Sequence, residues 1–467
     1  MTVEWILTPE RIYGAMGLVT AYAGMCWGIG TKVRKQRLAD EAESNVSQGD
    51  AAAPAVLVAY ASQTGQAEAL ARATVKMLVD GGLQVRLLPV EKLTAELLQQ
   101  YAHSLWLLST TGEGDAPDHS LGFVQQLMAT PPALTRHQSL VLALGDREYQ
   151  EFCAFGVKVH EWLQTSGARS DLVCVDNMDA SSLQSWQTQV AQMRQGLLGE
   201  SAPAQELDSD WLQTPASIPF VLSRRRLLNP GSQGGALYLL EWTPHSGELP
   251  RWESGDLVSL CVPADPERAR DYSIASITAD SSLQLLVRES TRADGSPGLA
   301  SHWLCCGMAE GDVLPLTLRE HRGFRLGDNA GRPLILIGNG SGLAGLLSHI
   351  RARVQQDCND QWLLFGERSP RHDAIFGDQL AAWAEQGRLA RLDQAWSRNG
   401  KDSRYVQDLL RSHAEEVRQW VERGAAIYVC GSLNGMGQGV HLTLQAILGE
   451  AKVAELLGSG RYRRDVY

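Results

Sequence analysis

The stretch Ala55-Val56-Leu57-Val58-Ala59-Tyr60, followed after one residue by Ser62-Gln63-Thr64-Gly65-Gln66-Ala67-Glu68, decides the fold of the first half of this chain. The first run is apolar, which is typical of a strand buried on both faces of a parallel sheet. The second run turns into a helix whose apolar face holds Leu70, Ala71 and Val75. Such a junction predicts an anion site, because free N–H groups and the helix dipole face the ligand. A plain helix-capping loop is the alternative. A nucleoside triphosphatase loop is excluded, because the turn contains no Gly-Lys-Ser/Thr.

Two further apolar runs end in polar loops. Leu105-Trp106-Leu107-Leu108 leads into residues 109–115, and Leu140-Val141-Leu142-Ala143-Leu144 leads into residues 145–153. Since the carboxyl ends of parallel strands meet at one edge of a sheet, the three loops enclose a crevice of the kind in which open α/β sheets bind ligands. We therefore expect an α/β domain over residues 54–199.

An all-β region is expected after a polar linker at residues 200–216. Short alternating apolar runs with Gly and Pro turns predict an antiparallel β-barrel over residues 217–328. Two motifs stand within it, Arg270-Asp271-Tyr272-Ser273 and Gly298-Leu299-Ala300-Ser301. Taken alone, the first motif could occur at a strand edge by chance. The presence of both motifs at this spacing strengthens the prediction of a ligand site.

A second α/β domain is predicted over residues 329–467. Pro333-Leu334-Ile335-Leu336-Ile337 leads into Gly338-Asn339-Gly340-Ser341-Gly342, which suits a pyrophosphate at a helix N-terminus. Another strand, Ile427-Tyr428-Val429-Cys430-Gly431, ends beside a thiol that would be a buried structural cysteine if it had no other context. The sequence closes with Arg463-Arg464-Asp465-Val466-Tyr467.

In the order and spacing of these motifs, residues 54–467 resemble the diflavin reductases, the family that contains NADPH–cytochrome P450 reductase and the sulfite reductase flavoprotein. The resemblance implies a flavodoxin-like α/β domain joined to a ferredoxin-NADP reductase-like module. That module would consist of an antiparallel β-barrel FAD domain and an α/β nicotinamide domain. The resemblance also implies FMN, FAD and NADPH as cofactors, because flavins can join a two-electron donor to a one-electron acceptor.

The same resemblance assigns FMN-binding residues to the three loops of the first domain. Tyr149 matches the aromatic side chain that stacks on the flavin, whereas Thr111 stands where some members have a second aromatic residue. The implied set is Ser62, Gln63, Thr64, Gly65, Gln66, Ala67, Ser109, Thr110, Thr111, Gly112, Gly114, Leu144, Gly145, Asp146, Tyr149, Phe152 and Cys153.

For FAD, the resemblance places Arg270 on the pyrophosphate, Tyr272 along the flavin and Ser273 near its reactive nitrogen. The full FAD set is Arg270, Tyr272, Ser273, Gly298, Leu299, Ala300, Ser301 and Tyr467. The nicotinamide cofactor is assigned Gly340, Ser341, Gly342, Ser397, Arg398, Tyr405 and Gln407. Since Ser397 and Arg398 match the segment that binds a 2′-phosphate, NADPH is expected in preference to NADH. A surface turn is the alternative for that segment.

Four residues are implied in hydride transfer itself. Ser273, Cys430 and Asp465 would stabilise charge around the reacting atoms, and the C-terminal Tyr467 would cover the flavin face and move aside for the nicotinamide. One departure from the family is evident. Only 14 residues separate Asp256 from Arg270, where P450 and sulfite reductases carry a helical connecting domain. We therefore expect a compact form in which the FMN domain is more mobile or docks in another way.

The N-terminus is predicted to be a membrane anchor. Residues 12–31 contain no charged side chain and are followed by Lys32, Arg34, Lys35 and Arg37, which by the positive-inside rule keeps the rest of the chain in the cytoplasm. A cleaved signal peptide is the rival interpretation. The expected layout is an anchor over residues 1–35 and a tether over 36–53. One helix stripe of small residues would meet a membrane partner or a second copy: Gly14, Gly17, Ala21, Gly24 and Gly28.

The net charge of −11 argues against nucleic-acid binding. Residues 50–200 hold 16 acidic against 9 basic side chains, which indicates either a solvated face or a docking surface for a basic acceptor. None of the eight cysteines forms a C-x-x-C pair, so no metal site is predicted.

The sequence thus predicts an NADPH-dependent diflavin oxidoreductase. Its expected acceptor is a membrane haem protein or a ferric siderophore system. The alternatives are a soluble haemoprotein, such as a P450 or sulfite reductase, and a flavin-binding redox sensor or assembly subunit without turnover. We expect a single-pass membrane protein with its catalytic domains in the cytoplasm. If the source is bacterial, the membrane would be the inner membrane.

Overall fold

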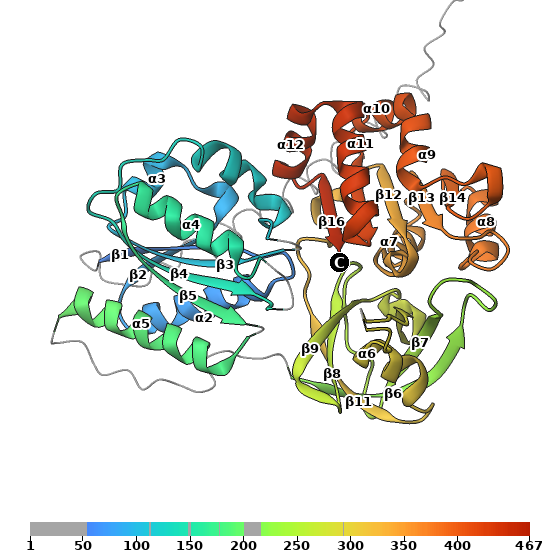
Figure 1. The fold of residues 1–467 in the computed structure, drawn as a ribbon, viewed down its shortest axis with the longest axis horizontal. Coiled ribbons are helices and arrows are strands. Elements are labelled where there is room, and N and C mark those ends of the chain that lie inside the picture. The colour runs from blue at the N-terminus through green and yellow to red at the C-terminus, as the bar shows by residue number, and fades with distance from the viewer. Residues whose placement is uncertain (1–53, 112–113, 148–150, 177, 200–215, 293) are drawn as a thin grey trace, which may run out of the picture.

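The computed structural model describes residues 54–467, apart from 112–113, 148–150, 177, 200–215 and 293. The described residues build three β-sheets, each with its own helices (Figure 1). The first lies to one side of the other two, which are stacked one above the other.

The first sheet is parallel and has the strand order β2-β1-β3-β4-β5. Its strands are β1 (Ala55–Ala61), β2 (Gln84–Pro89), β3 (His103–Ser109), β4 (Gln138–Gly145) and β5 (Arg169–Asp176). This is the flavodoxin-like order, and it confirms the predicted fold of this part of the chain. The sequence interpretation had identified β1, β3 and β4 by their apolar runs, but it had not identified β2 and β5.

Helices cover both faces of this sheet. Its helices and short turns are α2 (Gln66–Asp80), η1 (Val90–Lys92), α3 (Ala95–Gln99), η2 (Asp118–Ser120), η3 (Phe123–Leu127), α4 (Ala154–Thr165) and α5 (Ala180–Leu198). Helices α2 and α5 pack on one face, and α3 and α4 on the other (Figure 1). Side chains along β3 alternate between the two cores, since Leu105 and Leu107 join the first and Trp106 and Leu108 the second.

The second sheet has the order β10-β7-β6-β11-β8-β9, with antiparallel pairing between neighbouring strands. Its elements are β6 (Ile218–Leu227), β7 (Leu237–Pro244), β8 (Leu257–Val262), β9 (Asp265–Ser273), η4 (Thr278–Asp280), β10 (Leu283–Arg288), α6 (Leu299–His302), η5 (Trp303–Gly307) and β11 (Val313–Arg319). Strands β8 and β9 form a hairpin with a two-residue turn, so no domain is inserted between them, as the short spacing from Asp256 to Arg270 predicts.

The third sheet is parallel, with the order β14-β13-β12-β15-β16. Its strands are β12 (Leu334–Asn339), β13 (Gln361–Glu367), β14 (Arg391–Trp396), β15 (Ala426–Gly431) and β16 (Tyr462–Val466). The sheet reverses its order between β12 and β15, and ligands of open α/β sheets bind at such a point. The glycine turn after β12 lies there.

Two groups of helices sandwich this sheet. Helices α7 and α8 pack on one face and α9 to α12 on the other. The elements are η6 (Gly327–Asn329), η7 (Gly340–Gly342), α7 (Leu343–Gln355), α8 (Gly377–Glu385), η8 (Gly400–Asp402), α9 (Val406–Ser412), α10 (Ala414–Glu422), η9 (Leu433–Gly437), α11 (Gln438–Leu448) and α12 (Glu450–Gly458).

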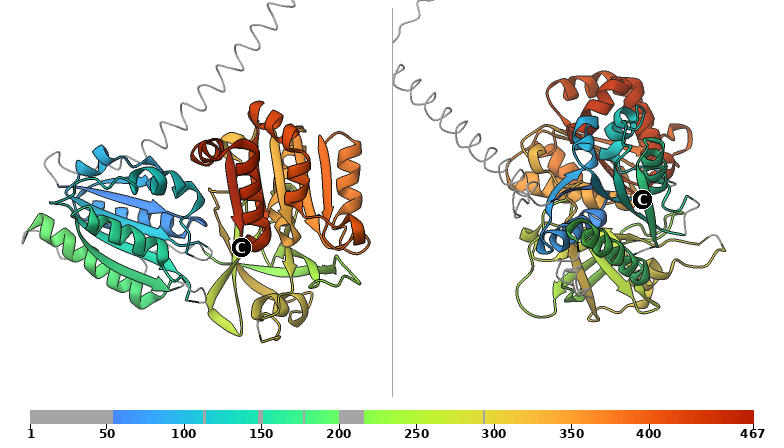
Figure 2. Two further views of the ribbon diagram at one scale, coloured as in Figure 1. Left: turned by 45° about the horizontal axis from the view of Figure 1, so that its top comes forward. Right: turned by 90° about the vertical axis from the view of Figure 1, so that its left-hand side faces the viewer.

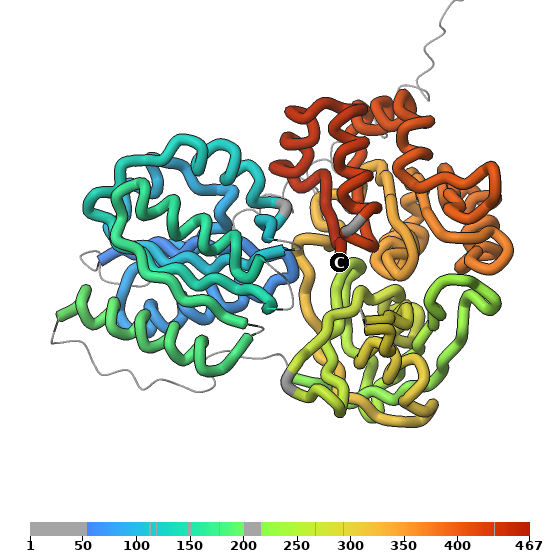
Figure 3. Tube along the Cα trace, in the orientation of Figure 1, coloured from blue at the N-terminus to red at the C-terminus, as the bar shows by residue number. Residues whose placement is uncertain are grey.

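The C-terminus lies at the junction of the three sheets (Figure 2). Strand β16 is the last segment of the chain, and it runs along β15 into this junction (Figure 3). Residues from all three parts of the molecule therefore meet around the terminal tyrosine.

The predicted anchor, tether and glycine stripe fall on residues 1–53, outside the described residues. Across the part of the chain that the structure describes, no helix combines the length and the apolar character needed to cross a bilayer. The prediction of a single-pass membrane protein is therefore corrected. Its weakness was to equate a run without charges with a strongly apolar run.

Candidate functional site

A cavity of about 1000 Å³ opens where the three sheets meet. Its lining comes from the first loop of the flavodoxin-like domain, Tyr272 and Ser273, the glycine turn, residues 397–407 and the C-terminus. The Gly298 turn, the strand at residues 427–431 and the two later loops of the flavodoxin-like domain do not line it. Members of the five contributing segments are Thr64, Ser273, Ser341, Tyr405 and Tyr467. The cavity thus joins the loop after β1 in the first domain to the glycine turn after β12 in the third.

Three of the four residues predicted to act in hydride transfer lie together beside this cavity. The hydroxyl of Ser273 donates a hydrogen bond to Oδ2 of Asp465 at 2.8 Å, and the Cys430 thiol lies 3.6 Å from the same oxygen. All three side chains are buried. Burial, reinforced by the Asp465 carboxylate, raises the pKa of Cys430 well above its ordinary value. Cys430 is therefore a neutral thiol at physiological pH.

Tyr467 stands at the mouth of this cluster. Its hydroxyl lies 3.2 Å from Oγ of Ser341 and donates a hydrogen bond to it. The side chain is 58% exposed, and its backbone N–H is bonded to the carbonyl of Gly431. The terminal ring is anchored through its backbone while its face remains open to the cavity, as a gating position requires.

The glycine turn after β12 allows close approach of the helix to the neighbouring strand. A Cβ at Gly342 would lie 2.1 Å from the Cys430 carbonyl oxygen, and one at Gly338 would lie 2.6 Å from it. Gly340 has a φ of +57°, which favours glycine. Turn and strand therefore form a cradle that only residues without side chains fit, as a bound pyrophosphate requires.

The segment predicted to bind the 2′-phosphate lies only partly on the cavity. Ser397, Tyr405 and Gln407 line it, and Tyr405 is 53% exposed. Arg398 is not among the lining residues, and its guanidinium donates to the carbonyl of the preceding residue. The cationic side chains that do line this region are Arg288, Arg368 and Arg404. The sequence interpretation had missed Arg288 and Arg368. Their positions could have indicated a phosphate site, because Arg288 ends strand β10 and Arg368 directly follows β13.

Arg270 does not face the cavity that Tyr272 and Ser273 line. Its guanidinium forms an ion pair of 2.7 Å with Asp265, five residues earlier on the same strand β9. The Gly298–Ser301 segment forms helix α6, and the Ser301 hydroxyl lies 2.7 Å from that of Ser290, which does line the cavity. The structure thus brings the second predicted segment near the cavity but pairs the arginine elsewhere.

The loop after β1, residues 62–67, has the predicted form of a turn that leads into a helix. Gly65 has a φ of +84° and precedes α2, and Oγ of Ser62 accepts a hydrogen bond from the N–H of Ala67 at 3.1 Å. Oγ of Ser109 accepts from the N–H of Gln63, which ties the first loop to the second. Thr110 Oγ1 is buried and has no hydrogen-bond partner within the described residues. A buried, unsatisfied hydroxyl at this crevice fits a polar ligand.

The second and third loops pack against each other. A Cβ on Gly114 would come within 2.7 Å of Glu151, and one on Gly145 within 2.6 Å of the Cys153 nitrogen. Thr111 closes its own loop by exchanging backbone hydrogen bonds with Asp115 at 2.9 Å. The predicted residues Gly112 and Tyr149 lie outside the described residues.

The first domain contacts the second directly here. Arg268, on strand β9, forms an ion pair of 2.7 Å with Asp146. Arg319 donates to the Thr64 carbonyl at 2.9 Å, and His321 donates to the Gln63 carbonyl at 2.9 Å. The hairpin and the segment after β11 therefore dock the flavodoxin-like domain without a connecting domain.

Two family models match the chain. The model described as "Flavodoxin" matches residues 58–200, and the model described as "Oxidoreductase NAD-binding domain" matches residues 336–441. The chain is an NADPH-dependent flavoprotein oxidoreductase. Its cofactors are FMN, FAD and NADPH.

Curated relatives agree over nearly the whole chain. The "Sulfite reductase [NADPH] flavoprotein alpha-component" of Vibrio cholerae is 25% identical over 553 aligned positions, which cover 91% of this chain and 90% of the relative. The proteins of the same name from Bacillus subtilis and Aliivibrio fischeri are each 24% identical, covering 90% and 95% of this chain and 91% and 94% of theirs. These matches support a place in the diflavin reductase family. Each alignment is longer than the 467 residues of this oxidoreductase, so the relatives contain segments that it lacks.

Proposed function

We propose that this oxidoreductase is the flavoprotein component of a two-component reductase and delivers electrons to a separate haemoprotein. The observation that carries the proposal is the single cavity that holds Thr64 of the phosphate loop together with Ser273 and Ser341 of the reductase module. A continuous site of this kind suits passage of electrons from NADPH to FAD, then to FMN, then to an acceptor at the outer rim of the flavodoxin-like domain.

The flavins supply the chemistry when bound, since they accept electron pairs and release single electrons. The proposed task of Ser273, Asp465 and Cys430 is to hold a hydroxyl, a carboxylate and a neutral thiol around the reacting position. Tyr467 would cover that position until the nicotinamide arrives. Arg368 and Arg404, rather than Arg398, are the cavity-lining cations proposed to receive the 2′-phosphate.

The acceptors expected first from the sequence are not retained. The relatives bear the name of a sulfite reductase component, and nothing in the comparisons supports a membrane haem protein or a ferric siderophore system. A sensor without turnover is not retained either, because the chain is an oxidoreductase. A sulfite reductase haemoprotein is therefore the acceptor that we propose.

The test is reconstitution of the purified full-length chain, loaded with both flavins, with a sulfite reductase haemoprotein. NADPH-dependent sulfide formation that requires both proteins supports the proposal. Cytochrome c reduction without sulfide formation would retain the reductase activity and reject this acceptor. Sulfide formation that is equally efficient with NADH and NADPH would reject the predicted cofactor preference.

A further inference from the structure

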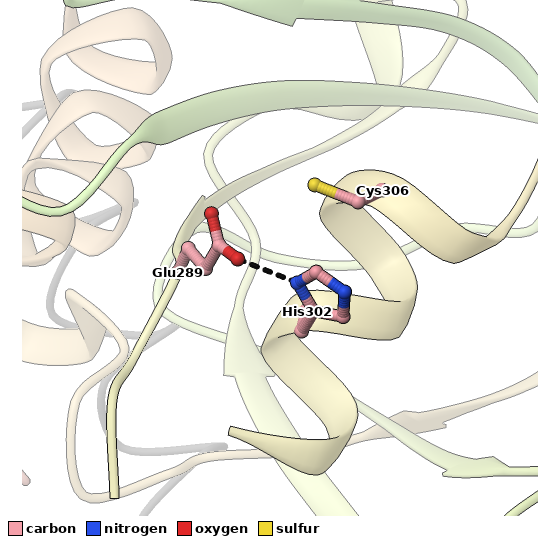
Figure 4. A group of neighbouring side chains, drawn as sticks. All are labelled: Glu289, His302 and Cys306. Carbon is pink, nitrogen blue, oxygen red and sulfur yellow. Dashed lines mark hydrogen bonds and ion pairs between the residues drawn. The ribbon is translucent and has the colours of Figure 1, made fainter. Parts of the chain in front are cut away.

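Beside the cavity, three side chains with metal-binding atoms converge at one end of the second sheet. Glu289 directly follows strand β10, His302 ends helix α6, and Cys306 lies in the helical turn η5 that follows (Figure 4). Figure 4 shows all three pointing toward one another. Their ligand atoms all lie within 4.8 Å of one another, and among the described residues no second group of three or more meets this criterion.

The backbone fixes this convergence. His302 and Cys306 are four residues apart on one continuous helical segment, so their side chains lie on the same face. The backbone N–H of Glu289 is bonded to the carbonyl of Ala236 at 2.8 Å, which holds the strand end beside that face. Nδ1 of His302 already lies 2.5 Å from Oε1 of Glu289.

The two neighbouring cysteines are in different environments. Cys305 is 1% exposed, whereas Cys306 is exposed. The sulfur that lies within 4.8 Å of the ligand atoms of Glu289 and His302 belongs to Cys306. The ligand-type cysteine is therefore Cys306.

We propose that Glu289, His302 and Cys306 form a binding site for a divalent zinc ion. One thiolate, one imidazole and one carboxylate are the donor types that zinc accepts, whereas magnesium and calcium prefer oxygen alone. Tetrahedral zinc with bonds of about 2.0–2.3 Å requires ligand atoms roughly 3.3–3.8 Å apart. Rotation of the exposed cysteine side chain and a small separation of the His302–Glu289 pair provide that geometry. Three protein ligands leave the fourth position to water.

The site would bridge two segments that also frame the cavity. Glu289 itself lines the cavity, and the next residue, Ser290, bonds to Ser301 of helix α6. A zinc ion would therefore fasten the end of β10 to α6, and its binding should raise the thermal stability of the folded chain in proportion to the logarithm of free zinc concentration. This inference does not depend on the identity of the electron acceptor.

The test uses the full-length flavoprotein, first freed of metal with a chelator and then equilibrated with zinc. We expect one zinc per chain, and X-ray absorption at the zinc edge should show one sulfur neighbour at about 2.3 Å together with nitrogen and oxygen neighbours. The variants Cys306→Ser and His302→Asn should each bind at least about tenfold more weakly, and the zinc that Cys306→Ser still takes up should show no sulfur neighbour.

The control is Cys358→Ser, a substitution of another accessible thiol far along the sequence, which should bind zinc as the parent does. The flavin content of each variant, read from its absorbance, verifies folding without reference to activity. Failure of the parent chain to take up one zinc overturns the site. A sulfur signal that persists in Cys306→Ser, or one lost in Cys358→Ser, also overturns it.

Discussion

At the scale of single residues, Asp465 connects the cluster around the reacting position, because it accepts hydrogen bonds from both Ser273 and Cys430. Asp465→Asn preserves the shape but removes the negative charge that faces developing positive charge. We expect NADPH to reduce the bound FAD about 10- to 100-fold more slowly, with little change in NADPH affinity. Stopped-flow absorbance measures both quantities. The control Asp328→Asn alters an exposed carboxylate, and an unchanged rate in Asp465→Asn would remove this residue from the mechanism.

Tyr467 is the second residue with a distinct expected effect. Its half-exposed ring stands at the cavity and bonds to Ser341 of the glycine turn. Tyr467→Ala opens the reacting position to either nicotinamide, so the preference for NADPH over NADH, as a ratio of kcat/KM, should fall at least about fivefold. Leu442→Ala, which truncates an exposed side chain outside this cavity, should leave the ratio unchanged. Identical kinetics of Tyr467→Ala and parent with both cofactors would reject the gating role.

At the scale of elements, the contact between turn η7 and strand β15 depends on the absence of a side chain. A Cβ at position 342 would lie 2.1 Å from a backbone oxygen and 2.4 Å from its carbon, neither of which can move aside cheaply. Gly342→Ala should lower the free energy of unfolding by at least about 2 kcal/mol and weaken NADPH binding. Gly331→Ala is the matched control, because open space surrounds that position. Chemical denaturation measures stability, and equal stability of the two variants would contradict the packing argument.

His349, on helix α7, makes the stability of the folded chain depend on pH. The side chain is buried between Phe324 and Tyr428, and burial, helped by Arg463, lowers its pKa to about 3. The unfolded chain takes up a proton near pH 6.5, whereas the folded chain resists it. Stability from this residue is therefore complete above pH 6.5 and is lost as the pH falls toward 3.

His349→Gln should remove this contribution to the pH dependence of the unfolding free energy. Between pH 6.5 and 4, the parent should lose a few kcal/mol more unfolding free energy than the variant, on the order of the pKa difference. Urea denaturation at a series of pH values measures both slopes. His245→Asn, at an exposed histidine, should retain the parental slope, and parallel curves for parent and His349→Gln would show that the buried ring carries no such linkage.

The elements themselves divide into those that sequence predicts and those that it does not. Runs such as residues 55–60 and 427–431 predict strands because both faces of a central parallel strand are buried. Strand β5 (Arg169–Asp176) escapes this rule, since it lies at the sheet edge and carries charged residues. Similarly, the motif Arg270 to Ser273 predicts a ligand site, but the ion pair of Arg270 with Asp265 depends on the local path of strand β9, which residue types alone do not specify.

At the scale of the whole molecule, the flavodoxin-like domain docks directly on the second domain, in a chain without the connecting domain that the resemblance led us to look for. The sequence predicted the absence of that domain, but it could not supply the contacts that hold the docked state, because they join residues more than 100 positions apart. Asp146 also shows that part of the acidic rim faces the chain's own Arg268. The acidic residues of the first domain that do not face the reductase module are available for the proposed acceptor. One acidic surface therefore serves internal docking and, as proposed, external recognition.

The ion pair between Arg268 and Asp146 allows this arrangement to be tested by charge reversal. Each single change, Arg268→Asp or Asp146→Arg, places like charges about 3 Å apart at a partly exposed contact. Transfer from the reductase module to the flavodoxin-like domain should slow about three- to tenfold in each. The double variant restores opposite charges and should recover most of the rate. Single-turnover reduction by NADPH, followed at wavelengths that separate the two flavins, measures this step, and the effect should shrink as salt is raised.

The matched control reverses Arg147 and Asp176, an ion pair within the flavodoxin-like domain, and should leave the transfer rate unchanged. If the double variant is as slow as the single variants combined, the two side chains act independently, and the docked geometry is not the one that transfers electrons.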